Sequence, residues 1–309
     1  MRIYVSGSLA FDRIMSFPGR FSDHILPDKI HILNVCFLVN GLDERFGGTA
    51  GNIAYSLALL GEKPVIVSSG GKDFGPYAER LEKLGLSLEG VRRVEDEFTA
   101  GAYITTDQSD NQITGFNPGA MKHKSGYKPD PGQEPALAIV SPGNLQDMLD
   151  YPAAYRKQGI PYIFDPGQNI TALTGDQLLG AINGSRALVT NDYELQLIMN
   201  ATGRTREELL GLTQALVTTL GEHGSVVAEA GKETRIKPAK AKKVSDPTGA
   251  GDAFRAGLLK GLVLGRSLAD AALLGSACAV WCVEQLGTQE HAFTEAEFWA
   301  RHKENFGGV

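Results

Sequence analysis

Short apolar runs alternate with longer segments of helical periodicity along the whole chain. Eight runs of three to five residues are rich in β-branched, aromatic and other apolar side chains, and such runs predict buried strands. The expected strands are 3–5, 64–68, 137–140, 162–164, 187–190, 216–219, 225–228 and 234–236. Apolar residues at helical spacing predict helices at 52–60, 77–84, 145–157, 176–183, 194–200, 206–210, 251–264, 268–285 and 295–303.

This alternation predicts an α/β fold, in which βαβ units build a mostly parallel sheet with helices on both faces. Ligand sites of such folds lie at the carboxyl ends of the strands. Two regions interrupt the alternation. Residues 31–39 form a long β-prone run with no helix beside it, and residues 103–106 and 112–116 flank a polar, turn-rich cluster. The second pattern predicts a β-hairpin.

Composition and charge narrow the class of protein. The chain has 309 residues, of which 42% are hydrophobic and 21% charged, as in an ordinary globular enzyme. A net charge of −6 argues against a general nucleic-acid binder. The three cysteines lack metal-site spacing, and their small odd number favours the reducing cytoplasm. No apolar run approaches the length of a membrane span.

The segment Asp-Pro-Thr-Gly-Ala-Gly-Asp-Ala-Phe at 246–254 carries the strongest chemical signal. A glycine-rich turn opens an apolar helix there, so the amides of Gly249, Ala250 and Gly251 can converge on an anion at the positive helix end. A carboxylate next to a phosphate site is repelled, unless Asp252 accepts the proton of an attacking hydroxyl. The segment predicts phosphoryl transfer to an alcohol; the alternative is a tight turn before a capped helix.

Other nucleotide-dependent classes are excluded by missing motifs. The chain has no Gly-x-x-x-x-Gly-Lys-[Ser/Thr] string and no protein-kinase motif set. A dehydrogenase is disfavoured because no Gly-x-Gly-x-x-Gly follows the first strand. A binding protein without chemistry would not need Asp252, although this alternative remains open.

The 246–254 segment resembles the signature of the ribokinase-like (PfkB) family of carbohydrate and nucleoside kinases. Further similar motifs lie at 7–12, 17–21, 26–27, 46–52, 116–120, 191–194 and 252–257. The N-terminal and middle motifs are most similar to the bacterial adenosine kinase branch. The resemblance implies one domain over residues 1–309, with a three-layer α/β/α core and a small β-sheet lid built from segments near 12–46 and 98–120.

The resemblance also implies roles on the nucleotide side, with ATP as co-substrate. Asn191 would lie near the phosphates and Glu194 would organise the water shell of Mg²⁺, whereas the same Asn-x-x-Glu pattern also fits a helix N-cap. Thr219, Gly221 and Gly224 resemble the family's nucleotide loop, although a plain turn would look the same.

Asp246 and Thr248 lie where relatives often bind a monovalent cation, which implies stimulation by K⁺.

On the acceptor side the resemblance implies a ribose site. Gly47 and Gly48 would let the sugar approach the backbone, Asn52 would hold a hydroxyl, and Asp12 would accept hydrogen bonds from a vicinal diol. Ser8 is expected in the same pocket. Without the resemblance, the glycines could serve only helix packing and Asp12 only a turn.

The base site is the least complete part of the pattern. Phe116 would stack on a purine, while Gln168 and Asn169 match a Gln-Gln pair that could reach the base edge. Ala102, followed by Tyr103, stands where some relatives carry a second stacking aromatic. Arg255 fits the branch, or pairs with a surface acid.

The leading prediction is an adenosine kinase that makes AMP, and the alternative is a ribose- or fructose-type sugar kinase. A lid would exclude water, which otherwise competes as phosphoryl acceptor. An exposed apolar lid sheet also favours pairing with a second copy, so we expect a homodimer through the lid.

Overall fold

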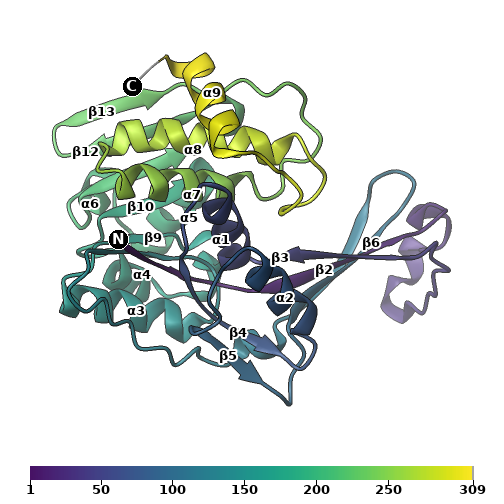
Figure 1. Ribbon diagram of the computed structural model, residues 1–309. Coiled ribbons are helices and arrows are strands. Elements are labelled where there is room, and N and C mark those ends of the chain that lie inside the picture. Colours follow the sequence, from purple (N-terminus) through teal and green to yellow (C-terminus); the bar gives the residue numbers. More distant parts are fainter. Residues whose placement is uncertain (308–309) are drawn as a thin grey trace.

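A nine-stranded sheet runs through the body of the molecule in the computed structural model, which describes residues 1–307 (Figure 1). Its strand order is β13-β12-β11-β10-β9-β8-β1-β4-β5. Neighbouring strands are parallel from β5 to β11, and β12 and β13 extend the sheet antiparallel. The strands are β1 (Arg2–Ser6), β4 (Val65–Gly71), β5 (Val91–Val94), β8 (Ala136–Val140), β9 (Tyr162–Phe164), β10 (Ala187–Asn191), β11 (Ala215–Thr219), β12 (Ser225–Glu229) and β13 (Lys232–Ile236).

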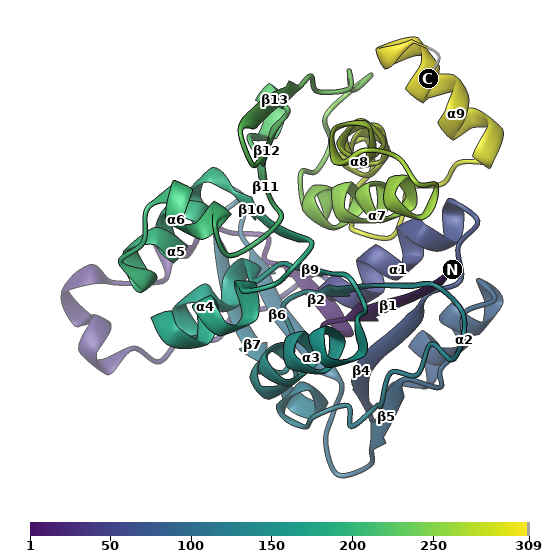
Figure 2. The ribbon, with the colours of Figure 1, turned by 90° about the vertical axis from the view of Figure 1, so that its left-hand side faces the viewer.

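Helices cover both faces of this sheet, as Figure 2 shows from the side. One layer holds α1 (Thr49–Leu59), α2 (Gly75–Lys83), α7 (Ala250–Val263) and α8 (Leu268–Val283), with α9 (Glu295–Phe306) packed on α8. The other holds α3 (Leu145–Gln158), α4 (Gly175–Ile182), α5 (Asp192–Thr202) and α6 (Arg206–Leu210). This confirms the predicted three-layer α/β/α fold. Within residues 1–307, no helix has both the length and the apolar character that crossing a membrane requires.

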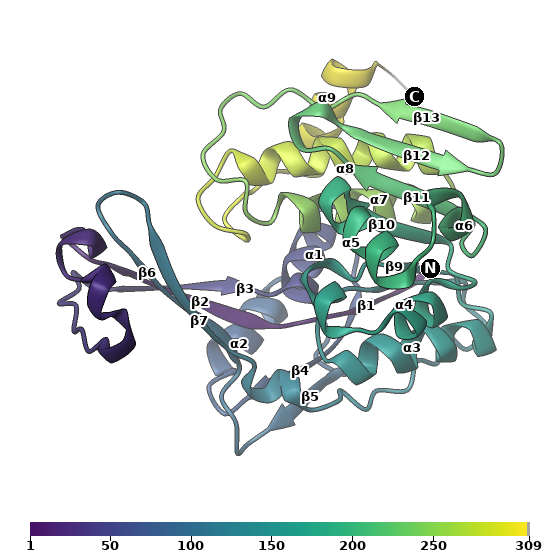
Figure 3. The same ribbon diagram turned by 180° about the vertical axis from the view of Figure 1, so that it is seen from behind.

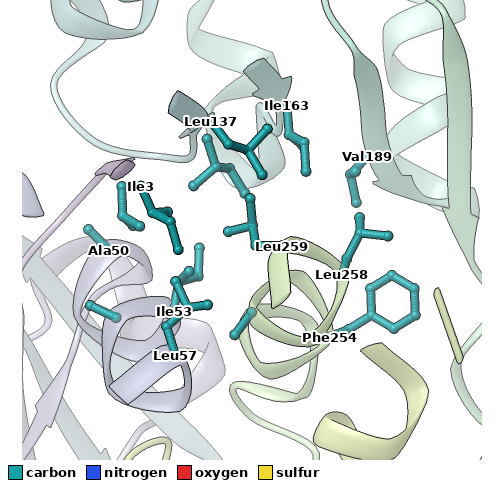
Figure 4. Packing of buried hydrophobic residues seen from close by; sticks show 14 of the residues in the cluster. Ile3, Ala50, Ile53, Leu57, Leu137, Ile163, Val189, Phe254, Leu258 and Leu259 are labelled. Carbon is teal, nitrogen blue, oxygen red and sulfur yellow. The ribbon is translucent and has the colours of Figure 1, made fainter. Parts of the chain in front are cut away.

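The strands are apolar throughout because both faces of the sheet are buried. Ile3 and Val5 join the core under α1 and α7, whereas Tyr4, between them, joins the core under α3 and α4. In the first core, side chains from four central strands meet side chains from α1 and α7 (Figure 4). The strands' carboxyl ends are thereby held at one edge, where the site lies.

A second sheet of four strands projects from the body (Figures 1 and 3). Its order is β3 (Leu42–Gly47), β2 (Ala10–Ser16), β6 (Ala100–Thr106) and β7 (Gln112–Asn117). The register sets Asp12 beside Ala102 and Ala102 beside Phe116, so these three residues share one face. Tyr103 pairs with Arg13 on the opposite face. Short 3₁₀ turns occur at Phe21–Asp23, Pro27–Ile32, Gly119–Lys122, Gly167–Ala172 and Gly221–His223.

Sequence patterning located the large sheet better than the small one. The predicted hairpin is confirmed as β6 and β7. β2 and β3 lie largely within the expected lid segment 12–46, but apolar patterning did not predict their bounds, and β5 was not anticipated. The β-prone run at 31–39 was wrongly expected to be extended: a 3₁₀ turn ends at Ile32, and residues 33–41 form no strand. Both edges of β2 are already paired, with β3 and β6, which leaves this run no partner beside β2.

Candidate active site

A cleft of about 810 Å³ lies where the carboxyl ends of the central strands meet the second sheet. Parallel strands bring their following loops to this edge together, so residues remote in sequence share one wall. Most of the predicted site residues line it: Ser8, Asp12, Gly48, Asn52, Phe116, Gln168, Asn169, Asn191, Glu194, Thr219, Gly221, Thr248, Gly249, Ala250, Gly251 and Asp252. Gly47, Tyr103, Gly224 and Asp246 do not line the cleft.

The glycine-rich turn forms the N-terminus of α7. Gly249 has φ +80°, and a Cβ there would lie 2.9 Å from Cβ of Thr288, so only glycine fits without strain. The Ala250 amide donates to the carbonyl of Pro247 at 3.2 Å. The amides of Gly249 and Gly251 have no hydrogen-bond acceptor within the described chain. These two amides lie at the positive end of a 14-residue helix and are available to an anion.

Asp252 follows in the first turn of α7 and is half-buried. The Asn52 Nδ2 atom donates to its Oδ2 atom at 2.8 Å. Burial raises the pKa of Asp252 to about 6, although Arg255 and the Asn52 hydrogen bond act in the opposite direction. A carboxylate with a pKa just below neutral is ionised at pH 7 and still basic enough to take a proton in a reaction.

A buried ion pair lies behind Asp252. The Arg255 Nη2 atom donates to the Asp165 Oδ1 atom at 2.6 Å, and both side chains are buried. The partner of Arg255 is therefore an acid at the end of β9 and not a surface acid. Desolvation raises the pKa of Asp165, and the Arg255 charge opposes this shift. Both residues line the cleft, and the Asp165 carboxylate balances the charge of the Arg255 guanidinium there.

Asp12 projects from β2 into the cleft. Burial raises its pKa, with Arg45 acting in the opposite direction. Within residues 1–307 no group donates a hydrogen bond to its carboxylate, so both oxygens are available to hydroxyl donors. Gly47 makes room for this side chain, because a Cβ there would lie 2.7 Å from Asp12 Oδ2. The Ser8 hydroxyl already bonds the start of α1, because its Oγ accepts from the Thr49 amide at 3.0 Å.

The aromatic wall of the cleft is one-sided. Phe116 lines it and is 53% exposed, and its neighbour on the same face is Ala102. The placement of Tyr103 in this site was wrong: its ring points to the other face, and its Oη accepts from Arg13 Nη1 at 3.2 Å. Alternation along β6 is the reason, because consecutive side chains point to opposite faces.

The side-chain amides of Gln168 and Asn169, which follow β9, differ in their hydrogen bonds. Asn169 Nδ2 donates to the carbonyl of Gly143 at 3.0 Å, which ties this side chain to the loop after β8. Gln168 is exposed in the cleft, and its amide has no hydrogen-bond partner in the part of the chain described. Gln168 is therefore the one of the two with both a free donor and a free acceptor.

The Asn191 and Glu194 side chains form a reciprocal capping box at the start of α5. Asn191 Oδ1 accepts from the Glu194 amide at 2.7 Å, and Glu194 Oε2 accepts from the Asn191 amide at 2.8 Å. The capping alternative is thus correct as a local structure. Both residues also line the cleft, and within residues 1–307 no group donates a hydrogen bond to the Oε1 atom of Glu194.

The loop that was predicted to lie on the nucleotide side follows β11. Thr219 and Gly221 line the cleft, but Gly224 does not. Gly224 has φ +86° and sits against the carbonyl of Ile236, 2.1 Å from where a Cβ would lie. It serves the turn into β12.

No group of three or more His, Cys, Asp or Glu side chains within residues 1–307 could hold a metal ion. A Mg²⁺ ion here would fit as one that draws most ligands from phosphates and water, with Glu194 nearby. The Asp246 carboxylate already accepts two backbone hydrogen bonds: its two oxygens accept from the amides of Thr248 and Gly287 at 2.9 and 3.0 Å.

Several cleft residues were not among the predicted site residues, because they lie in connecting segments or in the first turns of α1 and α5, where no apolar periodicity marks them. Among them are Thr49, Met121, Pro142, Gly143, Asp192, Tyr193 and Thr288. Thr288 Oγ1 donates to the carbonyl of Phe46 at 3.1 Å, a contact that ties the loop after α8 to β3.

Comparison with known proteins identifies the family. Residues 23–295 match the family described as pfkB family carbohydrate kinase. The chain belongs to the pfkB kinase family. It is therefore a phosphotransferase with an alcohol acceptor, and the sequence-based recognition is confirmed at this level.

Relatives of this pfkB-family kinase include nucleoside kinases. The nucleoside kinase of Methanocaldococcus jannaschii is 34% identical, over 83% of this chain and 85% of the relative. The structure of a Burkholderia thailandensis nucleoside kinase in complex with inosine superimposes with a TM-score of 0.88 at 39% identity, over 99% of this chain and 97% of that chain. Ribokinase from Thermotoga maritima, at 22% identity and a TM-score of 0.82, shares the fold.

Proposed function

We propose that this kinase transfers the γ-phosphoryl group of ATP to the 5′-hydroxyl of adenosine and releases AMP and ADP. The observation that carries the proposal is one continuous cleft. At one end lie Asp252 and the free amides of Gly249 and Gly251, and at the other lie Asp12 and Phe116. Similarity to nucleoside kinases supports a nucleoside as the acceptor.

At the phosphoryl end, Asp252 takes the proton of the acceptor hydroxyl as its oxygen attacks phosphorus. The new P–O bond forms while the bond to the bridging oxygen of ADP breaks. Amides of the turn at 249–251 stabilise the negative charge on the transferring group. Mg²⁺, when bound, neutralises phosphate charge, and we assign its water shell to Glu194. Asn191, Thr219 and Gly221 line the ATP side.

At the acceptor end, the free carboxylate of Asp12 accepts hydrogen bonds from the ribose 2′- and 3′-hydroxyls. Asn52 Nδ2 uses one hydrogen for Asp252, and its second hydrogen is available to a sugar oxygen. Ser8 and Gly48 complete this part of the wall.

At the base, Phe116 stacks on one side of the purine and Gln168 reaches its edge. The free amide of Gln168 offers a donor and an acceptor, so it suits a 6-amino or a 6-oxo group equally. Ala102 leaves the opposite side of the base without an aromatic. Discrimination between adenosine and inosine is therefore expected to be weak.

A free-sugar kinase of the ribose or fructose type is the second candidate. The exposed position of Phe116 and the small side chain of Ala102 favour it, because a purine would keep a large solvent-facing surface.

The test is ADP release from Mg-ATP with adenosine, inosine, ribose and fructose offered separately. Turnover with adenosine, and with inosine at a similar rate, supports the proposed base site. Turnover with a free sugar alone would replace adenosine by the second candidate. The Asp252→Asn variant measured in parallel separates turnover by this cleft from a contaminating kinase.

We further propose that residues 1–309 form a single kinase domain in which segments near 12–46 and 98–120 act as a lid over the acceptor. The lid sheet exposes apolar side chains, including Leu42 and Ile113 at 60% and 45%, and we propose that a second copy covers them in a homodimer. The three free cysteines agree with a cytoplasmic location, where ATP is abundant.

A K⁺ site beside Asp246 and Thr248 is the last part of the proposal. Both Asp246 oxygens already accept backbone amides, so the ion would share them. Rates that are equal in K⁺ and in a large inert cation would remove this site.

A further inference from the structure

We infer that Gln289 is a positioning residue, which orients the amide of Asn52 so that its N–H group faces the carboxylate of Asp252. The inference rests on the proposed role of Asp252 as the base. Gln289 lies in the loop between α8 and α9, is 1% exposed and does not line the cleft. It would therefore act through Asn52 and not by touching a substrate.

A chain of hydrogen bonds connects the backbone of β3 to the base. Tyr77 Oη, on α2, donates to the carbonyl of Gly47 at 2.7 Å. Gln289 Nε2 donates to Tyr77 Oη at 2.7 Å and to Asn52 Oδ1 at 3.0 Å. Asn52 Nδ2 then donates to Asp252 Oδ2 at 2.8 Å. Tyr77, Gln289 and Asn52 are all buried, so water does not replace these partners.

The direction of every bond in this chain follows from its first acceptor. A backbone carbonyl can only accept, so Tyr77 must donate to Gly47 and its oxygen is left to accept. Gln289 must then present its NH₂ group, and one hydrogen goes to Tyr77 and the other to Asn52. Asn52 consequently turns its oxygen toward Gln289 and its NH₂ group toward Asp252. Burial raises the pKa of Tyr77, which keeps the phenol protonated and the direction fixed.

The last hydrogen bond, from Asn52 to Asp252, can be reversed, because an asparagine amide has two nearly isosteric orientations that exchange its oxygen and its NH₂ group. In the observed one, an N–H group stabilises the ionised carboxylate. In the flipped one, a carbonyl oxygen would face Asp252, which then favours the protonated acid. Gln289 selects between them, since its NH₂ group repels the NH₂ group of a flipped Asn52.

Other groups that influence Asp252 do not provide this selection. Its ionisable neighbours are Arg255 on the same helix, and Asp165, Glu194, Tyr77 and Cys282 on other elements. Asn52 is the one side chain in residues 1–307 that donates a hydrogen bond to Asp252. Among the groups that influence the ionisation of Asp252, the orientation of Asn52 is therefore the one that a loop residue such as Gln289 can control.

A purely structural tie is the competing explanation, because Gln289 also accepts a hydrogen bond from Arg80 through its backbone carbonyl at 2.5 Å. The two explanations differ in pH dependence. Loss of a tie lowers activity equally at all pH values or lowers stability alone. Loss of orientation raises the pH at which the base ionises, so activity returns at high pH.

The experiment compares kcat against pH for wild type, Gln289→Leu and the control Gln285→Leu, with whichever acceptor gives turnover. Gln285 is an exposed glutamine in the same loop, and its side chain makes no hydrogen bond in the described structure. We expect the acid limb of Gln289→Leu to move up by about one pH unit, as expected for losing a hydrogen bond to a charged group. KM values should change little, and Gln285→Leu should follow wild type.

Tyr77→Phe supplies a milder variant if Gln289→Leu does not fold. It removes the anchor on Gly47 but keeps the Gln289 donor, so a smaller shift in the same direction is expected. Acid limbs that coincide with wild type in both variants would overturn the inference. An active Asp252→Asn variant would instead remove the proposed base, which distinguishes failure of the proposed function from failure of this inference.

Discussion

At the residue scale, the carboxylate of Asp252 meets two opposed demands. Its position at the cleft floor removes water from the charge, which raises its pKa to about 6. Its proposed role as the base nevertheless requires the ionised form, which Asn52 and Arg255 favour. A side chain that the fold holds in a costly charged state is typical of functional sites.

Asp252→Asn is expected to lower kcat by about 10²–10⁴-fold, the range for loss of a general base. The same variant should be more stable at pH 7.5, by about 1–2 kcal/mol after solvent screening, because a partly desolvated charge is removed. Thermal unfolding and steady-state kinetics measure both effects. Loss of stability together with full activity would contradict the assignment.

The pH dependence of this stability difference has a definite sign. The folded-state pKa near 6 lies above the ordinary 3.8, so the folded protein binds the proton more tightly than the unfolded chain. Tighter proton binding stabilises the folded wild-type protein at low pH, and this stabilisation is lost as pH rises from about 4 to 6. The Asn variant has no carboxylate at this position, so its stability does not change for this reason. The difference in melting temperature should thus be full above pH 6 and disappear toward pH 4, and wild-type kcat should fall below pH 6.

Gly47→Ala tests the space around Asp12. The added methyl would lie 2.7 Å from the Asp12 carboxylate, so this side chain must move. We expect a rise in KM for the acceptor of about tenfold, equivalent to about 1.4 kcal/mol, with a smaller change in KM for ATP. Gly115→Ala, on the same small sheet with open space around it, is the matched control and should keep both values.

At the element scale, the N-termini of α5 and α7 both begin a helix and line the cleft. The residues that cap α5 also face the cleft, and the turn that opens α7 presents amides without acceptors in the described chain to the same cleft. The unsatisfied amides of a first helical turn need acceptors from side chains or ligands. Sites at helix starts therefore combine a stability role and a binding role in the same atoms.

Glu194→Gln separates these roles at α5. A glutamine preserves a capping box, so the melting temperature should change by no more than about 2 °C, consistent with a change under 0.5 kcal/mol. The lost charge should raise the Mg²⁺ concentration needed for half-maximal rate several-fold. Asn191→Ala is the contrasting variant, expected to cost about 1 kcal/mol of stability through the lost cap. An unchanged Mg²⁺ titration in Glu194→Gln would leave only the capping role.

At the scale of the whole molecule, the projecting sheet exposes apolar side chains that the rest of the described chain does not cover. Leu42 and Ile113 lie on its edge strands and share the face opposite to Asp12. Exposed apolar side chains on unpaired edges favour association with a second copy.

Light scattering at micromolar concentration should therefore give twice the chain mass of 33.1 kDa. Leu42→Lys combined with Ile113→Lys should shift the mass toward that of one chain. Leu264→Lys, which replaces an exposed leucine at the end of α7, should not. A wild-type monomer would contradict the dimer.

The sequence by itself determined whatever depends on consecutive residues. The strands of the main sheet other than β5, and the helices around them, follow from apolar spacing. The glycine-rich turn at 246–254 and the cap at 191–194 follow from local backbone chemistry. These features need only neighbours within one or two helical turns, so a linear pattern contains them.

Tertiary structure alone decided which remote residues face each other. The register of the small sheet put Ala102, and not Tyr103, on the face that carries Asp12 and Phe116, and a one-residue offset reverses the face. Packing joined Arg255 to Asp165, 90 residues away, and Gln289 to Asn52, 237 residues away. No spacing rule links such pairs, because their contact depends on how α1, α7 and β9 pack and not on the chain between them.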